Sequence, residues 1–269
     1  MRQQMELAKK AAVEAGNLIT NLQGRTQISE KTTNNLVTQA DLDSERLIRS
    51  LIAGSFPDTD ILGEEEAGGT VANRKLWIVD PLDGTNNYAH GIPLYCVSIA
   101  YAEDGVVKAG VVYDPNRNEL FSAIKGEGAF LNDTPIHASH HASLRESIIV
   151  TGFHYDRGTM MKKTLQALYR LFKANIRGMR RTGTAALDLC WVACGRFDAY
   201  FEYILSPWDY AAGALIATEA GGVCSDREGR ELTLSTTGVI CSNQEINREL
   251  TGLVSWNYFS EVNDSGIPD

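Results

Sequence analysis

Apolar residues recur every three or four positions near the start of the chain. Between residues 5 and 22 this spacing forms one helical stripe, made of Met5, Ala8, Ala11, Ala12, Ala15, Leu18, Ile19 and Leu22. The spacing returns after a polar turn at Asn34 and Asn35, where Thr38 followed by Asp41 resembles the capping box that starts a helix. We therefore expect two amphipathic helices before the first strand.

Shorter apolar runs then indicate strands. DILGEEE predicts a short strand at 61–62 that leads into three glutamates, and KLWIVDP predicts a second strand that is stopped by Pro81. From 94 to 124 the hydrophobic runs are broken by turn residues such as Asp104 and Gly105, which is typical of an antiparallel meander. The first half predicts helices packed on an antiparallel sheet.

The second half alternates between strands and helices. Strands are predicted at SIIVTGF, FDAYFEY and TGVICSN. Helices are predicted at 159–174, at TGTAALDLCWVACGR, which Gly195 closes, at SPWDYAAGALIATEAGG and at 244–254. Such alternation indicates a sheet that is covered by helices on both faces. Without a linker between the halves, we expect one domain over 1–269, with sub-halves near 1–145 and 146–269.

Composition and charge narrow the functional classes. The chain has 269 residues, of which 43% are hydrophobic and 22% charged, as in ordinary globular proteins. Its net charge of −9 argues against nucleic acid as a partner, because phosphate backbones are bound by clustered Lys and Arg. No apolar run reaches the roughly 20 residues of a membrane span, and the first helix is amphipathic rather than signal-like. We expect a cytoplasmic protein without a membrane partner.

The stretch WIVDPLDGTNN places two carboxylates where a strand should end and a helix should begin. Asp80 ends the apolar run, Pro81 turns the chain, and Asp83 returns toward the same point. Gly84 and Thr85 then start a turn or helix whose free N–H groups suit a phosphate. Carboxylates beside an anion site favour Mg²⁺, although turn and N-cap roles would also explain both acids.

Other acids stand at comparable positions. Glu64 follows the preceding strand together with two more glutamates, and Asp41 lies at a helix start. In SPWDYAAG, Ser206 would be the N-cap, Pro207 the first helical residue and Asp209 the third, which is another capping box. Each acid alone could be exposed or a cap. Together they form a candidate metal site.

Long blocks of the chain resemble the inositol monophosphatase family. The family's signature is similar to WIVDPLDGTNNYAHGIPLYCVSIA. The family's other blocks are resembled, in the same order, by GEE at 63–65, GEGAFLND at 126–133 and the blocks at 180–202 and 206–222. The resemblance covers essentially the whole chain and looks closest to bacterial members. It implies the α+β or α/β layered α-β-α-β-α sandwich of inositol monophosphatases and fructose-1,6-bisphosphatases. It also implies a homodimer and inhibition by lithium.

The resemblance further implies a magnesium-dependent phosphatase with assigned positions. The metal ligands would be Glu64, Asp80, the backbone carbonyl of Leu82, Asp83 and Asp209. The substrate contacts would be Gly84, Thr85, Ala185, Glu202 and Asp209. The catalytic positions would be Glu64, Asp83 and Thr85, with Thr85 pairing with Glu64 to deprotonate the attacking water, while Lys31 and Asp41 would support the site. A third, looser Mg²⁺ would sit near Glu64.

The expected reaction is hydrolysis of a small phosphate monoester by activated water, and the substrate stays open. Asn86, Asn87 and Tyr88 stand where relatives that cleave 3′-phosphoadenosine nucleotides tend to read Lys-Glu-Phe, which favours inositol or sugar phosphates. Ser206 and Pro207 replace the His-Cys of animal enzymes, and 150–156 departs from the commoner Gly-Phe-Pro. Fructose 1,6-bisphosphate, histidinol phosphate and 3′-phosphoadenosine nucleotides remain alternatives.

Other classes of function are less well supported. No G-x-S-x-G elbow is present, so a Ser-His-Asp hydrolase is not indicated. Two residues separate Asp80 from Asp83, unlike the Asp-x-Asp of phosphatases that use an aspartyl nucleophile. A non-catalytic binding or regulatory protein on the same fold is the alternative from another class. Arg180 and Arg181 could contact a second phosphate or a neighbouring subunit, or form a solvated turn.

Overall fold

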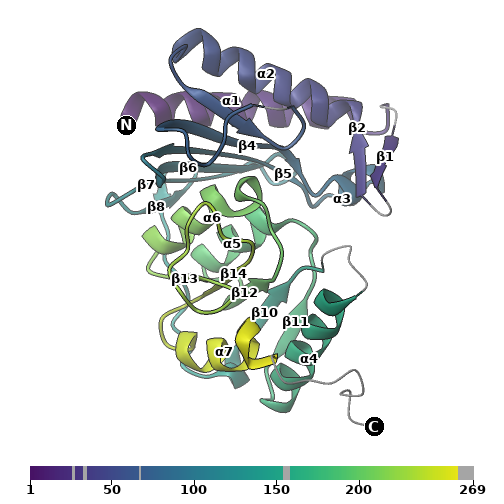
Figure 1. Cartoon of the computed structure of the whole chain (residues 1–269), viewed down its shortest axis with the longest axis vertical. Helices are drawn as coiled ribbons and strands as arrows, with labels where there is room; N and C mark the ends of the chain where they lie inside the picture. Colours follow the sequence, from purple (N-terminus) through teal and green to yellow (C-terminus); the bar gives the residue numbers. More distant parts are fainter. Residues whose placement is uncertain (26–27, 33–34, 67, 154–157, 260–269) are drawn as a thin grey trace.

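The computed structural model describes residues 1–25, 28–32, 35–66, 68–153 and 158–259. Five layers follow one another along the long axis of the molecule (Figure 1). Helices α1 and α2 cover the outer face of a seven-stranded sheet, and α5 and α6 lie between this sheet and a five-stranded sheet. Helices α4 and α7 cover the remaining face. The predicted α-β-α-β-α sandwich is therefore confirmed.

The outer layer consists of α1 (Arg2–Leu22) and α2 (Gln39–Ser55). Their apolar stripes pack on the sheet, and the buried residues of α1 include Met5 and Ile19. Between the helices lies a hairpin of β1 (Ile28–Thr32) and β2 (Asn35–Thr38), in which Ile28 pairs with Thr38. The expectation that two helices precede the first strand was wrong, because the hairpin strands are too short for a clear alternating pattern.

The seven-stranded sheet has the order β3-β4-β5-β6-β7-β8-β9. Its strands are β3 (Asp60–Gly63), β4 (Lys75–Asp83), β5 (Cys96–Glu103), β6 (Val106–Asp114), β7 (Glu119–Ile124), β8 (Ala129–Leu131) and β9 (Thr134–Pro135). The predicted meander is confirmed, since β5 to β9 pair antiparallel in sequence order. The expectation of a wholly antiparallel sheet was wrong, because β3 and β4 are parallel. The prediction that Pro81 stops the strand was wrong, since β4 continues to Asp83. The register shifts between the pairs Asp80–Ser98 and Asp83–Cys96, so an irregularity in the ladder accommodates the proline.

The middle layer joins the two sheets through α5 (Ala185–Ala193) and α6 (Pro207–Glu219). Both helices are almost entirely buried, which explains why their sequences are apolar on every side. Small residues set the distance between α6 and the seven-stranded sheet. A Cβ added to Gly110 of β6 would lie 3.0 Å from both Cα and O of Ala212, so α6 approaches the sheet backbone closely.

The five-stranded sheet has the order β11-β10-β12-β14-β13. Its strands are β10 (Ile148–Thr151), β11 (Gly178–Arg180), β12 (Ala199–Glu202), β13 (Val223–Asp226) and β14 (Val239–Ser242). Helices α4 (Thr159–Lys173) and α7 (Asn247–Val254) pack on it. Strands β11 and β13 were not predicted, and both are short strands at the edges of the sheet.

A short helix, α3 (Thr85–Ala89), follows β4 directly. The 3₁₀ turns η1 (Leu144–Glu146) and η2 (Trp256–Phe259) complete the secondary structure of the described residues. Among the helices of the described ranges, none combines the length and apolarity that crossing a membrane requires.

Candidate functional site

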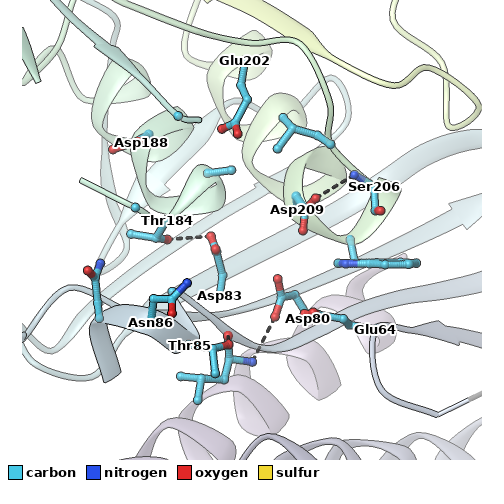
Figure 2. A pocket seen from close by; sticks show the side chains of 18 of the residues that line it. Glu64, Asp80, Asp83, Thr85, Asn86, Thr184, Asp188, Glu202, Ser206 and Asp209 are labelled. Atoms are coloured by element: carbon cyan, nitrogen blue, oxygen red, sulfur yellow. Dashed lines mark hydrogen bonds between the residues drawn. The ribbon is translucent and has the colours of Figure 1, made fainter. Parts of the chain in front are cut away.

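A pocket of about 280 Å³ opens between the seven-stranded sheet and the N-terminal ends of α3, α5 and α6. Acidic side chains dominate its lining, and they come from five separate segments of the chain: Glu64, Asp80 and Asp83, Asp188, Glu202, and Asp209. Figure 2 shows these carboxylates around one opening. The structure thus brings together Glu64, Asp80, Asp83 and Asp209, as the sequence predicted.

The irregular end of β4 delivers two of the acids. Asp80 is buried, with 1% of its surface exposed, and its Oδ1 accepts a hydrogen bond from the backbone N–H of Leu82 at 3.0 Å. Asp83 points toward α5, where its Oδ2 accepts hydrogen bonds from the Thr184 hydroxyl at 2.6 Å and the Ala186 N–H at 2.8 Å. Both carboxylates keep an oxygen that these bonds do not use.

Two helix starts supply further acids through the same local motif. At the start of α6 the backbone N–H of Ser206 donates to Asp209 Oδ2 at 2.7 Å, and Pro207 is the first helical residue. At the start of α2 the backbone N–H of Thr38 donates to Asp41 Oδ2 at 2.8 Å. Both predicted capping boxes are confirmed. Each box fixes the direction of a carboxylate as well as starting a helix.

Thr85 lies beside Asp41. Its hydroxyl is 3.0 Å from Asp41 Oδ1 and 3.1 Å from the carbonyl oxygen of Leu82. Gly84, with φ of +96°, precedes it as the N-cap of α3, and this left-handed conformation favours glycine. Asp41 is therefore a direct partner of Thr85, closer to the candidate chemistry than the supporting position that the sequence indicated.

The three glutamates after β3 separate in space. Glu64 lines the pocket. The backbone N–H of Glu65 donates to Glu45, and the Glu66 carboxylate lies 3.3 Å from Arg46 Nε on the outer layer. Only the first glutamate of the run therefore faces the acidic pocket.

Burial and mutual repulsion shape the electrostatics. Burial, followed by the charges of Glu64, Asp83 and Asp209, raises the pKa of Asp80 well above its usual range. Burial raises the pKa of Asp83 to about 6, although the hydrogen bond from Thr184 opposes this. Among the described residues, neither acid forms a salt bridge with a lysine or arginine. A cation in the pocket would relieve this repulsion.

The donor set fits a hard divalent cation. Mg²⁺ prefers carboxylate and carbonyl oxygens and keeps several waters, so a few acids on one side of an open pocket suffice. Within the described ranges, no three His, Cys, Asp or Glu side chains surround a common point closely enough to enclose an ion as they stand. The pocket therefore presents an open array of carboxylates, and the individual ligand assignments stay predictions.

The other end of the pocket contains residues that the sequence only partly indicated. Ala185 and Glu202, the predicted substrate contacts, both line it, as does Arg181. Asp188 and Thr184 also line it but were not predicted. Asp188 is the one acid in an otherwise apolar helix, and its Oδ1 accepts a hydrogen bond from the Thr182 hydroxyl. A lone acid in an apolar helix is a signal that could have identified it, because burying a carboxylate is unfavourable.

Some predicted residues lie elsewhere or outside the described residues. Arg180 is exposed, and its guanidinium donates to the Met179 carbonyl at 2.9 Å. Lys31 belongs to β1, but its side chain lies outside the described part of the chain. The departure from the family pattern noted at 150–156 is described only as far as residue 153.

Comparison with known proteins gives consistent matches. The model of the inositol monophosphatase family matches residues 1–258. The inositol-1-monophosphatase of Synechocystis sp. is 45% identical over 253 residues, which are 92% of this chain and 87% of that protein. The Nus factor SuhB of Escherichia coli is 39% identical over 251 residues, 91% of this chain and 93% of that protein.

A solved structure agrees in fold as well as in sequence. The extragenic suppressor protein suhB from Bartonella henselae has a TM-score of 0.89 and 37% identity, covering 94% of this chain and 99% of that chain. The matches span both sheets and every segment that contributes an acid to the pocket. The chain belongs to the inositol monophosphatase family.

Proposed function

We propose that this protein is a Mg²⁺-dependent phosphomonoesterase that hydrolyses inositol monophosphate or a related sugar or polyol phosphate with activated water. One observation carries the proposal. Glu64, Asp80, Asp83 and Asp209, from distant parts of the sequence, line one pocket next to the hydrogen-bonded pair Thr85 and Asp41. Family membership supports the phosphatase class.

The carboxylates hold the cofactor in this proposal. Glu64, Asp80, Asp83, Asp209 and the Leu82 carbonyl are the candidate ligands. Bound Mg²⁺ would supply Lewis-acid chemistry, which lowers the pKa of water and neutralises the negative charge of the phosphate. An acidic pocket can bind an anionic ester only when such positive charge is present.

Thr85 and Asp41 provide a route for the proton of the attacking water. When the Thr85 hydroxyl donates to Asp41 Oδ1, its oxygen keeps a lone pair that can accept a proton. Burial raises the pKa of Asp41, an effect that hydrogen bonds from Thr38 and Thr85 partly offset, and a raised pKa makes the carboxylate a better base. Glu64 would orient the same water from the opposite side. The amides of Gly84 and Thr85 would contact the phosphate.

The leaving group would occupy the end lined by Ala185 and Glu202. A carboxylate accepts hydrogen bonds from hydroxyls and repels a second phosphate, which favours a neutral polyol over a bisphosphate. Arg181 also lines the pocket and is the residue that a second phosphate would use. Fructose 1,6-bisphosphate, histidinol phosphate and 3′-phosphoadenosine nucleotides therefore belong in the test panel.

Phosphate release from inositol 1-phosphate, with Mg²⁺ and with EDTA, tests the proposal. We expect turnover that requires Mg²⁺ and that lithium inhibits, and a panel of the other esters ranks the substrates. The E. coli relative that bears the name Nus factor supports a binding role as the second candidate. Absence of turnover on every ester of the panel would contradict the hydrolase and favour that role.

A further inference from the structure

Glu202 lies at the end of β12 and lines the pocket on the side opposite Glu64 and Asp80 (Figure 2). Its carboxylate receives a hydrogen bond from the strand itself. Tyr200, two residues earlier on the same face of β12, donates its hydroxyl to Glu202 Oε2 at 2.8 Å. Because Tyr200 is completely buried, its ring cannot move to follow a displaced carboxylate. The tyrosine fixes one oxygen and leaves Oε1 for a ligand.

The neighbouring strand also lies directly against the carboxylate. Strands β10 and β12 are parallel, and Thr151 pairs with Phe201, so the next residue, Gly152, lies beside Glu202. A Cβ added to Gly152 would overlap Oε2 and Cδ of Glu202 and would lie 2.6 Å from Oε1. Gly152 does not have a positive φ, so its backbone conformation would accept alanine. The carboxylate is what makes a side chain at 152 unfavourable.

We propose that Gly152 and Tyr200 are positioning residues that hold the Glu202 carboxylate where it accepts a hydrogen bond from a substrate hydroxyl, and that they thereby set the preference for polyol phosphates. This inference rests on the proposed phosphatase function. Two independent features define the position of the Glu202 carboxylate: the hydrogen bond from Tyr200 and the absence of a side chain at Gly152. The candidate metal ligands take no part in either contact.

Gly152→Ala tests the assignment, because the added methyl must displace the Glu202 carboxylate. Two substrates separate its effects: inositol 1-phosphate, which carries hydroxyls, and p-nitrophenyl phosphate, which carries none. We expect kcat/KM for inositol 1-phosphate to fall roughly 10- to 100-fold, as for loss of a hydrogen bond to a charged group. The value for p-nitrophenyl phosphate should stay within about twofold, since phosphate and metal binding are untouched.

A matched control and a double-mutant cycle show whether the effect passes through Glu202. Gly252→Ala in α7 is the control, because a Cβ there meets no atom within 4 Å and the glycine does not have a positive φ. In a Glu202→Ala background, Gly152→Ala should cause no further loss of selectivity. An equal loss in both backgrounds, or an equal loss on both substrates, would overturn the proposal.

Tyr200→Phe probes the second contact with the ring retained. It should reduce the selectivity for inositol 1-phosphate in the same direction as Gly152→Ala. An unchanged ratio of the two kcat/KM values in a folded Tyr200→Phe protein would remove Tyr200 from the assignment. Circular dichroism and the melting temperature establish whether each variant is folded.

A crystal structure of Gly152→Ala decides the positioning step without any turnover. We expect the Glu202 carboxylate to leave the Tyr200 hydroxyl and rotate into the pocket. A carboxylate that stays in place while β10 moves away would contradict the positioning role. If the unaltered protein hydrolyses neither ester, the proposed function fails, and the crystal structure still tests whether Gly152 fixes Glu202.

Discussion

Asp83 combines a cost to folding with a role in the proposed function. Its Oδ2 accepts hydrogen bonds from Thr184 and Ala186 at the start of α5, while its charge lies close enough to Asp80 and Asp209 to raise their pKa values. A neutral residue of the same shape would keep the hydrogen bonds and remove the repulsion. In the proposed function the charge has a purpose, because a cation would bind to the carboxylate and not to the neutral residue.

Asp83→Asn separates these two contributions. We expect turnover to fall by roughly a hundredfold or more, because a metal ligand is lost, while the melting temperature of the metal-free protein rises. The increase in melting temperature on adding Mg²⁺ should become smaller. Calorimetry with Mg²⁺ and with EDTA measures both stability effects, and Asp58→Asn on the exposed surface is the control. An active variant, or one that Mg²⁺ stabilises as before, would remove Asp83 from the site.

Thr85→Ala addresses the proposed proton route. It removes the hydroxyl that lies 3.0 Å from Asp41 and leaves the backbone of α3 unchanged. We expect kcat to fall by about 10²–10⁴-fold, the usual range for a general base, with little change in the Mg²⁺ concentration needed for half-maximal rate. Thr85→Ser should retain most of the activity. A large increase in that Mg²⁺ concentration would instead identify Thr85 as a metal ligand.

Helix starts connect local structure to the pocket at the scale of elements. The capping box of α2 fixes Asp41, and that of α6 fixes Asp209. The sequence signal for a helix start therefore also marked one acid of the pocket lining, Asp209, and the acid partner of Thr85, Asp41. The acids of β4 were predictable as a pair, but their geometry was not. Pro81 indicated the end of a strand, whereas the pairing of Asp83 with Cys96 of β5 continues the strand past the proline.

The elements that the sequence did not reveal share a physical reason. Strands β1, β2, β11 and β13 contain three to five residues, too few for an alternating pattern, and they form because a neighbouring strand supplies hydrogen-bond partners. Thr184 and Tyr200 were missed for a similar reason. Their roles depend on which carboxylate the fold places beside them, and single-chain periodicity contains no such information.

Thr38→Ala tests the coupling between a helix cap and the site. The Thr38 hydroxyl lies 3.1 Å from the Ala40 N–H and 2.6 Å from Asp41 Oδ2. Loss of the cap should destabilise the protein by about 1 kcal/mol. In a chain of this size the melting temperature should then fall by about 2–4 °C. We also expect a lower kcat with an unchanged KM, because Asp41 loses a partner that orients it. A loss of stability with full activity would show that the cap is only structural.

At the scale of the whole molecule, the expected homodimer needs a surface. Helix α4 exposes Leu165, Tyr169 and Phe172, which are spaced so that they share one face and are 39%, 50% and 58% exposed. We expect the protein to be a dimer by light scattering and the double variant Tyr169→Glu with Phe172→Glu to be a monomer. Val106→Glu, at another exposed apolar residue, is the control. A dimer that survives the double change would exclude this face.

The acidic pocket also makes the stability of the whole molecule depend on pH. Burial raises the pKa of Glu202 to about 7 and that of Asp83 to about 6, whereas these groups titrate near 4 in an unfolded chain. Between about pH 4 and the raised pKa of each group, the folded protein keeps a proton that the unfolded chain has released. Their contribution to stability is therefore complete below about pH 4 and is lost as the pH rises through 6 to 7.

In EDTA we expect these groups to lower the melting temperature as the pH rises from 5 to 8. Mg²⁺ should oppose the decrease most strongly at pH 8, where the carboxylates are charged and bind a cation best. Glu202→Gln isolates one contribution, because the amide is neutral throughout. The difference in melting temperature between the unaltered protein and this variant should change between pH 5 and about 7, where the folded carboxyl keeps a proton that the unfolded one has released, and should level off above that range. A difference that does not vary between pH 5 and 8 would mean that Glu202 is solvated, and a solvated carboxylate would not need the fixed position that Tyr200 and Gly152 give it.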